Sequence, residues 1–184
     1  TFRGTAREGT CEQSEDYMLQ SLYALDKKLN DNEVLYLNLH PVSQSTVNFG
    51  DFKNIKPFPS NLDTYDFLNI ADCLVSDYSS VFFDFACTKK KIILFTFDKE
   101  EYLRDRGLYI SLDELHYPQV SDYKALLDEM RAEKNYDDTE FLQKFCPYDN
   151  INSSKQLCDQ IILGKDCGLK TESMPNNGKE NVLI

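Results

Sequence analysis

Several residue types are scarce in this chain of 184 residues, and each scarcity excludes a class of protein. Tryptophan is absent and histidine occurs twice. Neither histidine has a cysteine partner at the spacing of zinc ligands, so we expect no zinc site and no other metal site. No apolar run approaches the roughly 20 residues that a membrane-spanning helix needs. We therefore do not expect this chain to cross a membrane.

Positively charged residues are also few, since the chain has 20 Lys and Arg and 31 Asp and Glu, for a formal net charge of −11. A general nucleic-acid binder needs clustered Lys and Arg, so the acidic balance argues against nucleic acid as a partner. It does not exclude a local anion site built from backbone N–H groups. The chain begins at Thr1 without an initiator methionine, as expected of a piece of a longer protein.

The apolar residues that are present alternate between helical spacing and the mostly apolar runs of buried strands. Met18, Leu22, Leu25 and Leu29 recur at helical spacing and predict a helix over about 12–29. The other predicted helices cover 81–88, 121–131, 139–145 and 153–163. The predicted strands cover 34–39, 55–58, 73–77 and 92–97, with an edge strand at 108–110. A further helix is expected to start near Ser60, with its apolar stripe on Leu62, Phe67, Leu68 and Ile70.

This alternation predicts the fold class and the domain organisation. Strands that alternate with helices indicate an α/β domain with a Rossmann-like parallel sheet and helices on both faces. We expect that domain to cover residues 1–163. From Gly164 onward Gly, Asn, Lys, Glu and Pro dominate without periodicity, which predicts a flexible tail over 164–184. The run Lys89-Lys90-Lys91 is expected to be a solvated helix end.

Ligands of parallel α/β sheets bind at the carboxyl ends of the strands, and two polar clusters fall there. One is the Asp77–Ser80 segment, which joins a predicted strand to a helix. Ser79 and Ser80 would offer small donors at a helix start, where phosphate binds readily. The alternative is that one of these serines is only the helix N-cap.

The second cluster is His40-Pro41, where proline leads the chain out of the sheet. A histidine exposed there can act as an acid, a base or a cation near neutral pH, or it is bonded to loop backbone. Asp84 stands among phenylalanines and needs a partner, with structural support as its expected role. Arg106 falls in what we interpret as a polar loop, where it can contact phosphate or carboxylate.

Taken together, several segments resemble the C-terminal donor-binding half of the CDP-glycerol glycerophosphotransferase family, the polymerases and primases of teichoic acid. They are Leu37–Pro41, Ile70–Phe85, Phe97–Tyr102 and Arg106–Tyr109. The resemblance covers roughly residues 1–163. It implies a GT-B fold with two Rossmann-like domains, of which this chain would be the C-terminal one. The family's other histidine, in a Trp-His-Gly stretch of the N-terminal half, lies outside this chain.

The resemblance also implies an activity and roles for residues. Such enzymes move glycerol phosphate from CDP-glycerol, or ribitol phosphate from CDP-ribitol, onto a polyol-phosphate polymer or lipid-linked primer and release CMP, with no cofactor. By similarity, His40 would be catalytic, Ser79 and Ser80 would hold the diphosphate, and Arg3 would lie at the mouth of the cleft. The turn at Pro57 and Phe58 would receive the cytosine through backbone groups. The other residues expected to bind substrate are Asp77, Tyr78, Asp84 and Arg106.

The chain departs from the family at Leu115-His116-Tyr117-Pro118, where Leu-Pro-Gly-Pro is usual. Two alternatives stay open: a GT-B sugar-nucleotide enzyme, either a glycosyltransferase or a 2-epimerase, and a non-catalytic nucleotide-binding module. Family members work in the cytoplasm, on the inner face of the cell membrane. This chain shows no basic amphipathic helix, so membrane contact is expected from the missing part.

Overall fold

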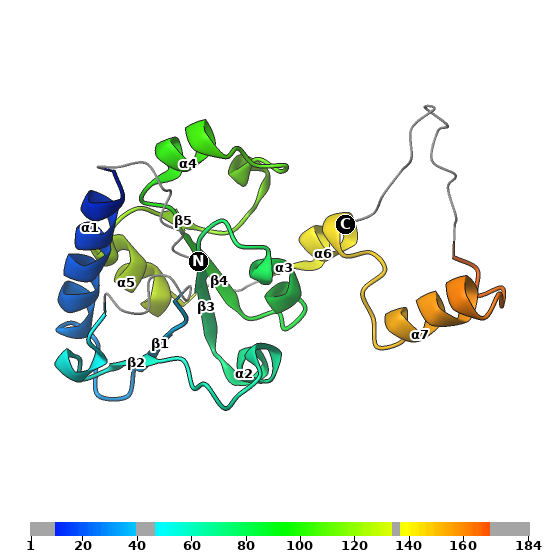
Figure 1. Ribbon diagram of the computed structural model, residues 1–184, viewed down its shortest axis with the longest axis horizontal. Coiled ribbons are helices and arrows are strands. Elements are labelled where there is room, and N and C mark those ends of the chain that lie inside the picture. Colours follow the sequence, from blue (N-terminus) through cyan, green and yellow to red (C-terminus); the bar gives the residue numbers. More distant parts are fainter. Residues whose placement is uncertain (1–9, 40–46, 134–136, 170–184) are drawn as a thin grey trace. The chain divides into compact units, whose positions relative to one another are not determined.

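A computed structural model of the chain describes residues 10–39, 47–133 and 137–169 (Figure 1). The chain divides into two compact units, Thr1–Phe145 and Cys146–Ile184. The helices of the first unit are α1 (Thr10–Asp26), α2 (Thr64–Ile70), α3 (Val81–Ala86), α4 (Lys99–Asp105), α5 (Tyr123–Arg131) and α6 (Thr139–Phe145), with short 3-10 turns at Phe49–Asp51 and Leu112–Glu114. Its strands are β1 (Leu35–Leu37), β2 (Ile55–Pro57), β3 (Cys73–Ser76), β4 (Lys91–Phe95) and β5 (Gln119–Val120).

All strand pairs in the described residues are parallel, which confirms the predicted α/β class. The hydrogen bonds divide the strands into two sheets, β1-β2 and β3-β4-β5. Figure 1 shows α1 and α5 on one side of the strands and α3 on the other. The sequence predicted a single sheet. Between β1 and β3, where a continuous sheet would pair, the structure instead has a cavity lined by residues of both strands.

The main core forms where α1 packs against strands and against α5. Met18, Leu22 and Leu25 of α1 are buried, as their spacing predicts, together with Ile55 of β2 and Ile93 of β4. Helix α1 ends at Asp26 rather than near residue 29. The Asp26 carboxylate accepts the backbone N–H groups of residues 53–55 and so joins this helix end to the start of β2.

A second apolar cluster, made of aromatic side chains, lies between α3, α6 and the segment before β5. Phe82 and Phe83 of α3 lie against Phe141 of α6, with ring centroids 6.3 and 5.3 Å apart. Tyr117 joins them from the Leu115–Pro118 segment, 5.1 Å from Phe141. The neighbouring His116 contacts Asp138, a fully buried carboxylate, at 2.9 Å. The segment that departs from the family pattern is therefore a packing element here.

Two sequence-based predictions are wrong in this unit, and a third is only partly correct. Residues 108–110 do not form the edge strand; that place is taken by β5, whose Val120 carbonyl accepts the N–H of Thr96. The segment from Tyr102 to Arg106, expected to be a polar loop, is helix α4 up to Asp105 with Arg106 as its C-cap residue. Of the stripe expected on the helix near Ser60, Leu62 and Ile70 are exposed. Phe67 and Leu68 are half-buried as predicted, and Phe67 packs edge-on against Tyr36 and Phe58.

The lysine run is not simply a solvated helix end. The Lys90 ammonium donates to the carbonyls of Asn69 and Ala71 at the end of α2. The Lys91 ammonium donates to three carbonyls, those of residues 129, 130 and 132, at the end of α5. Both lysines therefore satisfy carbonyls that a helix end leaves without partners.

The second unit contains α7 (Ser153–Leu157), continued by one turn of π-helix over Cys158–Ile162. Asp159 pairs with Lys155 and Lys165. The Gln160 side chain exchanges two hydrogen bonds with the backbone of Leu169, so the first residues of the predicted tail fold back on the helix. The tail and its boundary stay predictions, because residues 170–184 lie outside the described part. Within the described ranges, no helix is both long and apolar enough to span a bilayer.

Candidate functional site

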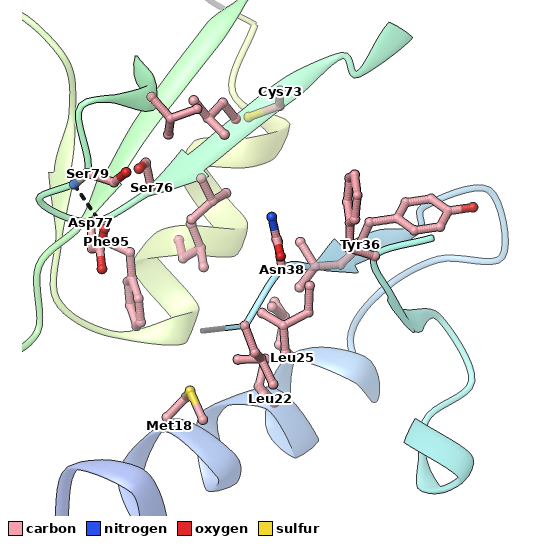
Figure 2. A pocket seen from close by; sticks show the side chains of 18 of the residues that line it. Met18, Leu22, Leu25, Tyr36, Asn38, Cys73, Ser76, Asp77, Ser79 and Phe95 are labelled. Atoms are coloured by element: carbon pink, nitrogen blue, oxygen red, sulfur yellow. Dashed lines mark hydrogen bonds between the residues drawn. The ribbon is translucent and has the colours of Figure 1, made fainter. Parts of the chain in front are cut away.

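The carboxyl ends of β1, β2 and β3 border one cavity of about 910 Å³. It is lined by Leu37–Leu39 after β1, Phe58 after β2 and Asp77–Ser79 after β3. Figure 2 shows β1 and β3 on two sides of it and α1 below. In open parallel sheets the ligand binds at such strand ends, where successive connections leave in opposite directions. The cavity also extends along β1 and β3 to the core residues of α1, and its part at the carboxyl ends of the strands is where a substrate site is expected.

The cavity combines an apolar interior with a polar end. Met18, Leu22 and Leu25 of α1 line the interior, together with Phe95 of β4 (Figure 2). The Cys73 thiol also faces it, and burial raises the pKa of this thiol to about 11, so it is neutral and unreactive near pH 7. At the carboxyl ends of the strands the lining becomes polar: Asp77, Tyr78, Ser79, Asp98, Glu101, Tyr102, Asp105 and Arg106.

The two predicted phosphate-binding serines occupy different environments. Ser79 is half-buried and lines the cavity, and its backbone N–H donates to the Asp77 carboxylate at 3.1 Å (Figure 2). Ser80 is exposed and lies outside the lining. It is the N-cap residue of α3, yet its side chain makes no capping hydrogen bond. The alternative interpretation was that one of these serines only caps the helix with its side chain, and Ser80 does not do so. Helix α3 has only six residues, which leaves little macrodipole for an anion.

Tyr78 is tied to the segment that follows β4. Its hydroxyl donates to the Asp98 carboxylate at 2.8 Å, and its ring stacks on that of Tyr102 with centroids 3.7 Å apart. Burial, and then the hydrogen bond to Asp98, raise the pKa of Tyr78 above its ordinary value. The hydroxyl thus stays protonated, and its donor is directed at Asp98.

Arg106 lies at the C-terminal end of α4 and reaches the cavity. In the described part of the chain, Arg104 and Arg131 pair with the carboxylates of Asp105 and Glu33, and Arg106 is the arginine with no carboxylate at ion-pair distance. Its guanidinium is therefore available to an anionic ligand.

The sequence analysis did not predict that α4 and its N-cap residue line the cavity through Asp98, Glu101 and Tyr102. The sequence does contain signals for this helix. Glutamates stand in the first turn of α4 and Arg104 in its last, as helix ends prefer. Gly107 follows with φ +71°, the conformation of a residue just past a helix end.

The remaining predicted residues lie at the edge of the cavity or outside it. Phe58 lines it, but its N–H is already used by the Leu37 carbonyl, so only its own carbonyl is left for a base. Pro57 is exposed and does not line the cavity. Asp84 is exposed on α3 and accepts the Tyr65 hydroxyl at 3.4 Å. This contact agrees with the structural role that the sequence analysis expected for Asp84.

Arg3 and His40, which were predicted as site residues, lie outside the described residues. His40 directly follows Leu39, which is buried and lines the cavity. Within the described lining, the polar end holds the carboxylates of residues 77, 98, 101 and 105 and a single cation, Arg106. An anionic ligand therefore needs further positive charge there. The described residues contain no group of three or more His, Cys, Asp or Glu arranged to hold a metal ion.

Comparison with known proteins gives consistent matches. The chain is 31% identical to the teichoic acid glycerol-phosphate primase of Bacillus subtilis (strain 168), over 79% of this chain and 40% of that protein. It is 32% identical to the teichoic acid glycerol-phosphate transferase of Staphylococcus aureus (strain NCTC 8325 / PS 47), over 85% of this chain and 41% of that protein. The chain thus spans about two fifths of these relatives.

Solved structures give the same answer. A variant of the wall teichoic acid polymerase TagF superposes with a TM-score of 0.70 at 25% identity, over 89% of this chain and 42% of that one. The same TagF variant, solved after a soak with CDPG, superposes with a TM-score of 0.66 at 26% identity, over 79% of this chain and 38% of that one. Residues 1–163 match the family described as CDP-Glycerol:Poly(glycerophosphate) glycerophosphotransferase. The fold is therefore that of one half of a GT-B transferase, and the chain belongs to the CDP-glycerol glycerophosphotransferase family.

Proposed function

We propose that this chain is the nucleotide-donor half of an enzyme that transfers glycerol phosphate from CDP-glycerol to a polyol-phosphate polymer or a lipid-linked primer. One observation carries the proposal: the ends of β2 and β3 and the C-terminal end of α4 bring residues that were predicted to bind the donor into the lining of one cavity. They are Phe58, Asp77, Tyr78, Ser79 and Arg106. The volume of about 910 Å³ is in the range of cavities that hold cofactor-sized ligands.

The proposed reaction is a direct displacement at the β-phosphorus of CDP-glycerol. A terminal hydroxyl of the acceptor forms the new P–O bond and loses its proton, while the bond from the β-phosphorus to the bridging oxygen breaks and CMP leaves. Negative charge grows on the transferred phosphoryl oxygens and on CMP. Catalysis of this kind depends mainly on positioned donors. Ser79 and Arg106 supply one hydroxyl and one guanidinium for that purpose.

His40 is proposed as the catalytic histidine of this half. It directly follows the buried Leu39 and belongs to the Leu37–Pro41 motif shared with the family. As imidazolium it would offset charge on the phosphoryl oxygens, and as neutral imidazole it would take the acceptor proton. His40→Ala in the full-length enzyme is expected to lower turnover about 10²-fold, with little change in melting temperature. Normal turnover with a large loss of melting temperature would make His40 a scaffold residue.

We also propose that the acceptor is met at the cytoplasmic face of the cell membrane, through the part of the protein outside this chain. Supporting this, the relatives are named for teichoic acid synthesis and the chain spans about two fifths of their length. The N-terminal half of the same polypeptide would complete the site, so the isolated chain is expected to bind the donor without turning it over.

The test is calorimetric titration of the chain with CDP-glycerol, CDP-ribitol and a UDP-sugar. Binding of a CDP-polyol, displaced by CMP and absent for the UDP-sugar, supports the proposal. The relative affinities for CDP-glycerol and CDP-ribitol assign the polyol. If the UDP-sugar binds and neither CDP-polyol does, the chain belongs to a sugar-nucleotide enzyme instead.

A further inference from the structure

Two stacked tyrosines bridge the segments that follow β3 and β4 at the polar end of the cavity. Tyr78 stands in the turn after β3, and Tyr102 lies on α4. Their rings lie 3.7 Å apart between centroids and 19° from parallel. This is the closest ring contact among the described residues, and both side chains line the cavity.

A carboxylate reinforces this contact. Asp98 is the N-cap residue of α4, and aspartate is among the residues that most often cap a helix with the side chain. Its carboxylate nevertheless makes no capping bond and accepts the Tyr78 hydroxyl at 2.8 Å. Because burial raises the pKa of Tyr78, the hydroxyl keeps its proton and the bond persists at neutral pH. The side chain that could stabilise its own helix is thus used to hold the turn after β3.

Each tyrosine is also linked to one proposed ligand contact. Tyr78 directly precedes Ser79, whose N–H is held by the Asp77 carboxylate. The Tyr102 carbonyl accepts the N–H groups of Arg106 and Gly107 at the end of α4. The stacked pair therefore connects the backbone that carries Ser79 to the helix end that carries Arg106, at the polar end of the cavity.

We infer that Tyr78, Asp98 and Tyr102 form a positioning clamp that sets the separation of Ser79 and Arg106 for the diphosphate of a nucleotide donor. The inference rests on the proposed function for the identity of the ligand. The clamp residues act through Ser79 and Arg106 and are positioning residues. A diphosphate needs donors at two fixed places, and without the clamp the turn and α4 are held together there by fewer contacts.

The test compares variants that separate the loss of the hydrogen bond from the loss of the charge. Tyr78→Phe keeps the stack and loses the hydroxyl bond. Asp98→Ala loses the acceptor and the charge, whereas Asp98→Asn loses the charge but keeps an amide oxygen that accepts. The matched control is Tyr23→Phe. That tyrosine donates to Asp51 at 3.0 Å and stacks on a phenylalanine 4.8 Å away, and it does not line the cavity.

Two measurements are made on every variant of the full chain: hydrogen exchange of the Ser79 and Arg106 amides without ligand, and CDP-glycerol affinity by calorimetry. Tyr78→Phe and Asp98→Ala should speed exchange of the Ser79 amide about threefold or more and weaken affinity about tenfold. Asp98→Asn should restore both to near wild type, and the double variant Tyr78→Phe with Asp98→Ala should be no worse than either single change. Tyr23→Phe should change neither.

The clamp is overturned if Tyr78→Phe and Asp98→Ala leave exchange and affinity within twofold of wild type. It is also overturned if Asp98→Asn is as impaired as Asp98→Ala, since charge would then be the cause, or if Tyr23→Phe reproduces the losses. If wild type itself fails to bind CDP-glycerol, the proposed function falls and the diphosphate assignment with it. The exchange rates then still report separately on whether the clamp orders the turn.

Discussion

At the scale of single residues, neighbouring side chains of one motif have separate roles. Ser79 lines the cavity, whereas Ser80 is exposed and outside it, although both belong to the same Asp-Tyr-Ser-Ser motif. The Tyr78 hydroxyl donates to Asp98. The motif therefore forms a wall of the cavity, and we propose that the Ser79 hydroxyl is the one that contacts the ligand.

This separation predicts unequal effects of two similar substitutions. Ser79→Ala should weaken CDP-glycerol binding about tenfold or more, because a hydrogen bond to a charged group contributes roughly 1.5–3 kcal/mol. Ser80→Ala is the matched control and should change the affinity less than about twofold. Calorimetry measures both, with circular dichroism to confirm folding. Equal losses from the two variants would mean that the turn binds the diphosphate in another arrangement.

The sequence predicted part of this site for a general reason. Asp77 and Ser79 were predicted because ligands of parallel sheets bind at the carboxyl ends of the strands, and that rule needs only strand positions. It cannot tell which residues of the turn face the cavity, so Ser80 was included although it is exposed. The pairing of Tyr78 with Asp98 joins residues 20 positions apart and depends on which strands are neighbours.

At the scale of helices and strands, local pattern predicted those elements whose burial follows from their own spacing. Helix α1 and strand β4 are of this kind, with buried Leu22 in one and Ile92 to Leu94 in the other. β5 was misplaced because its two residues are defined by hydrogen bonds to β4 rather than by an apolar run. The lysines at 90 and 91 were misinterpreted for a similar reason, since the carbonyls they contact belong to helices distant in sequence.

The Lys91 contacts predict a stability effect. Lys91→Met removes a charged donor from three carbonyls at the end of α5 and should lower the free energy of unfolding by about 1.5–3 kcal/mol. Lys124→Met is the control, because Lys124 is exposed on the same helix. Urea unfolding followed by circular dichroism measures both. A Lys91 variant as stable as the Lys124 variant would show that water replaces the ammonium without cost.

Another link between elements predicts a pH dependence. Arg131 at the end of α5 donates twice to Glu33, before β1, and the Arg131 hydrogen bond lowers the Glu33 pKa from 4.5 to about 2. A carboxylate with a lowered folded pKa stabilises above its unfolded pKa and loses that contribution as it is protonated. The contribution should therefore be full above about pH 4.5 and disappear as the pH falls toward 2. Because Arg131 is 39% exposed, solvent screening limits it to about 1 kcal/mol.

Glu33→Gln isolates this contribution. Urea unfolding of wild type and variant from pH 6 to pH 2.5 should give a difference in stability that is largest at pH 6 and shrinks as the pH falls. A difference that is independent of pH would assign the effect to packing rather than to the charge of Glu33.

At the scale of the whole molecule, the cavity that we propose for the donor has few positive charges at its described polar end. The lining at the polar end contains four carboxylates and one guanidinium, that of Arg106. A diphosphate therefore needs cations from elsewhere, and the proposed roles of His40 and Arg3 meet that need. The remaining groups of the reaction would come from the other half of the enzyme, since this chain spans about two fifths of its relatives.

The central claim is that the nucleotide donor occupies this cavity, and hydrogen exchange with and without CDP-glycerol tests it most directly. The measurement is the exchange rate of each peptide of the chain at saturating ligand. Slower exchange at 35–39, 73–79 and 97–106, with no change in the second unit from residue 146 onward, is the predicted result. Binding accompanied by protection elsewhere, and none in those three segments, would contradict the account.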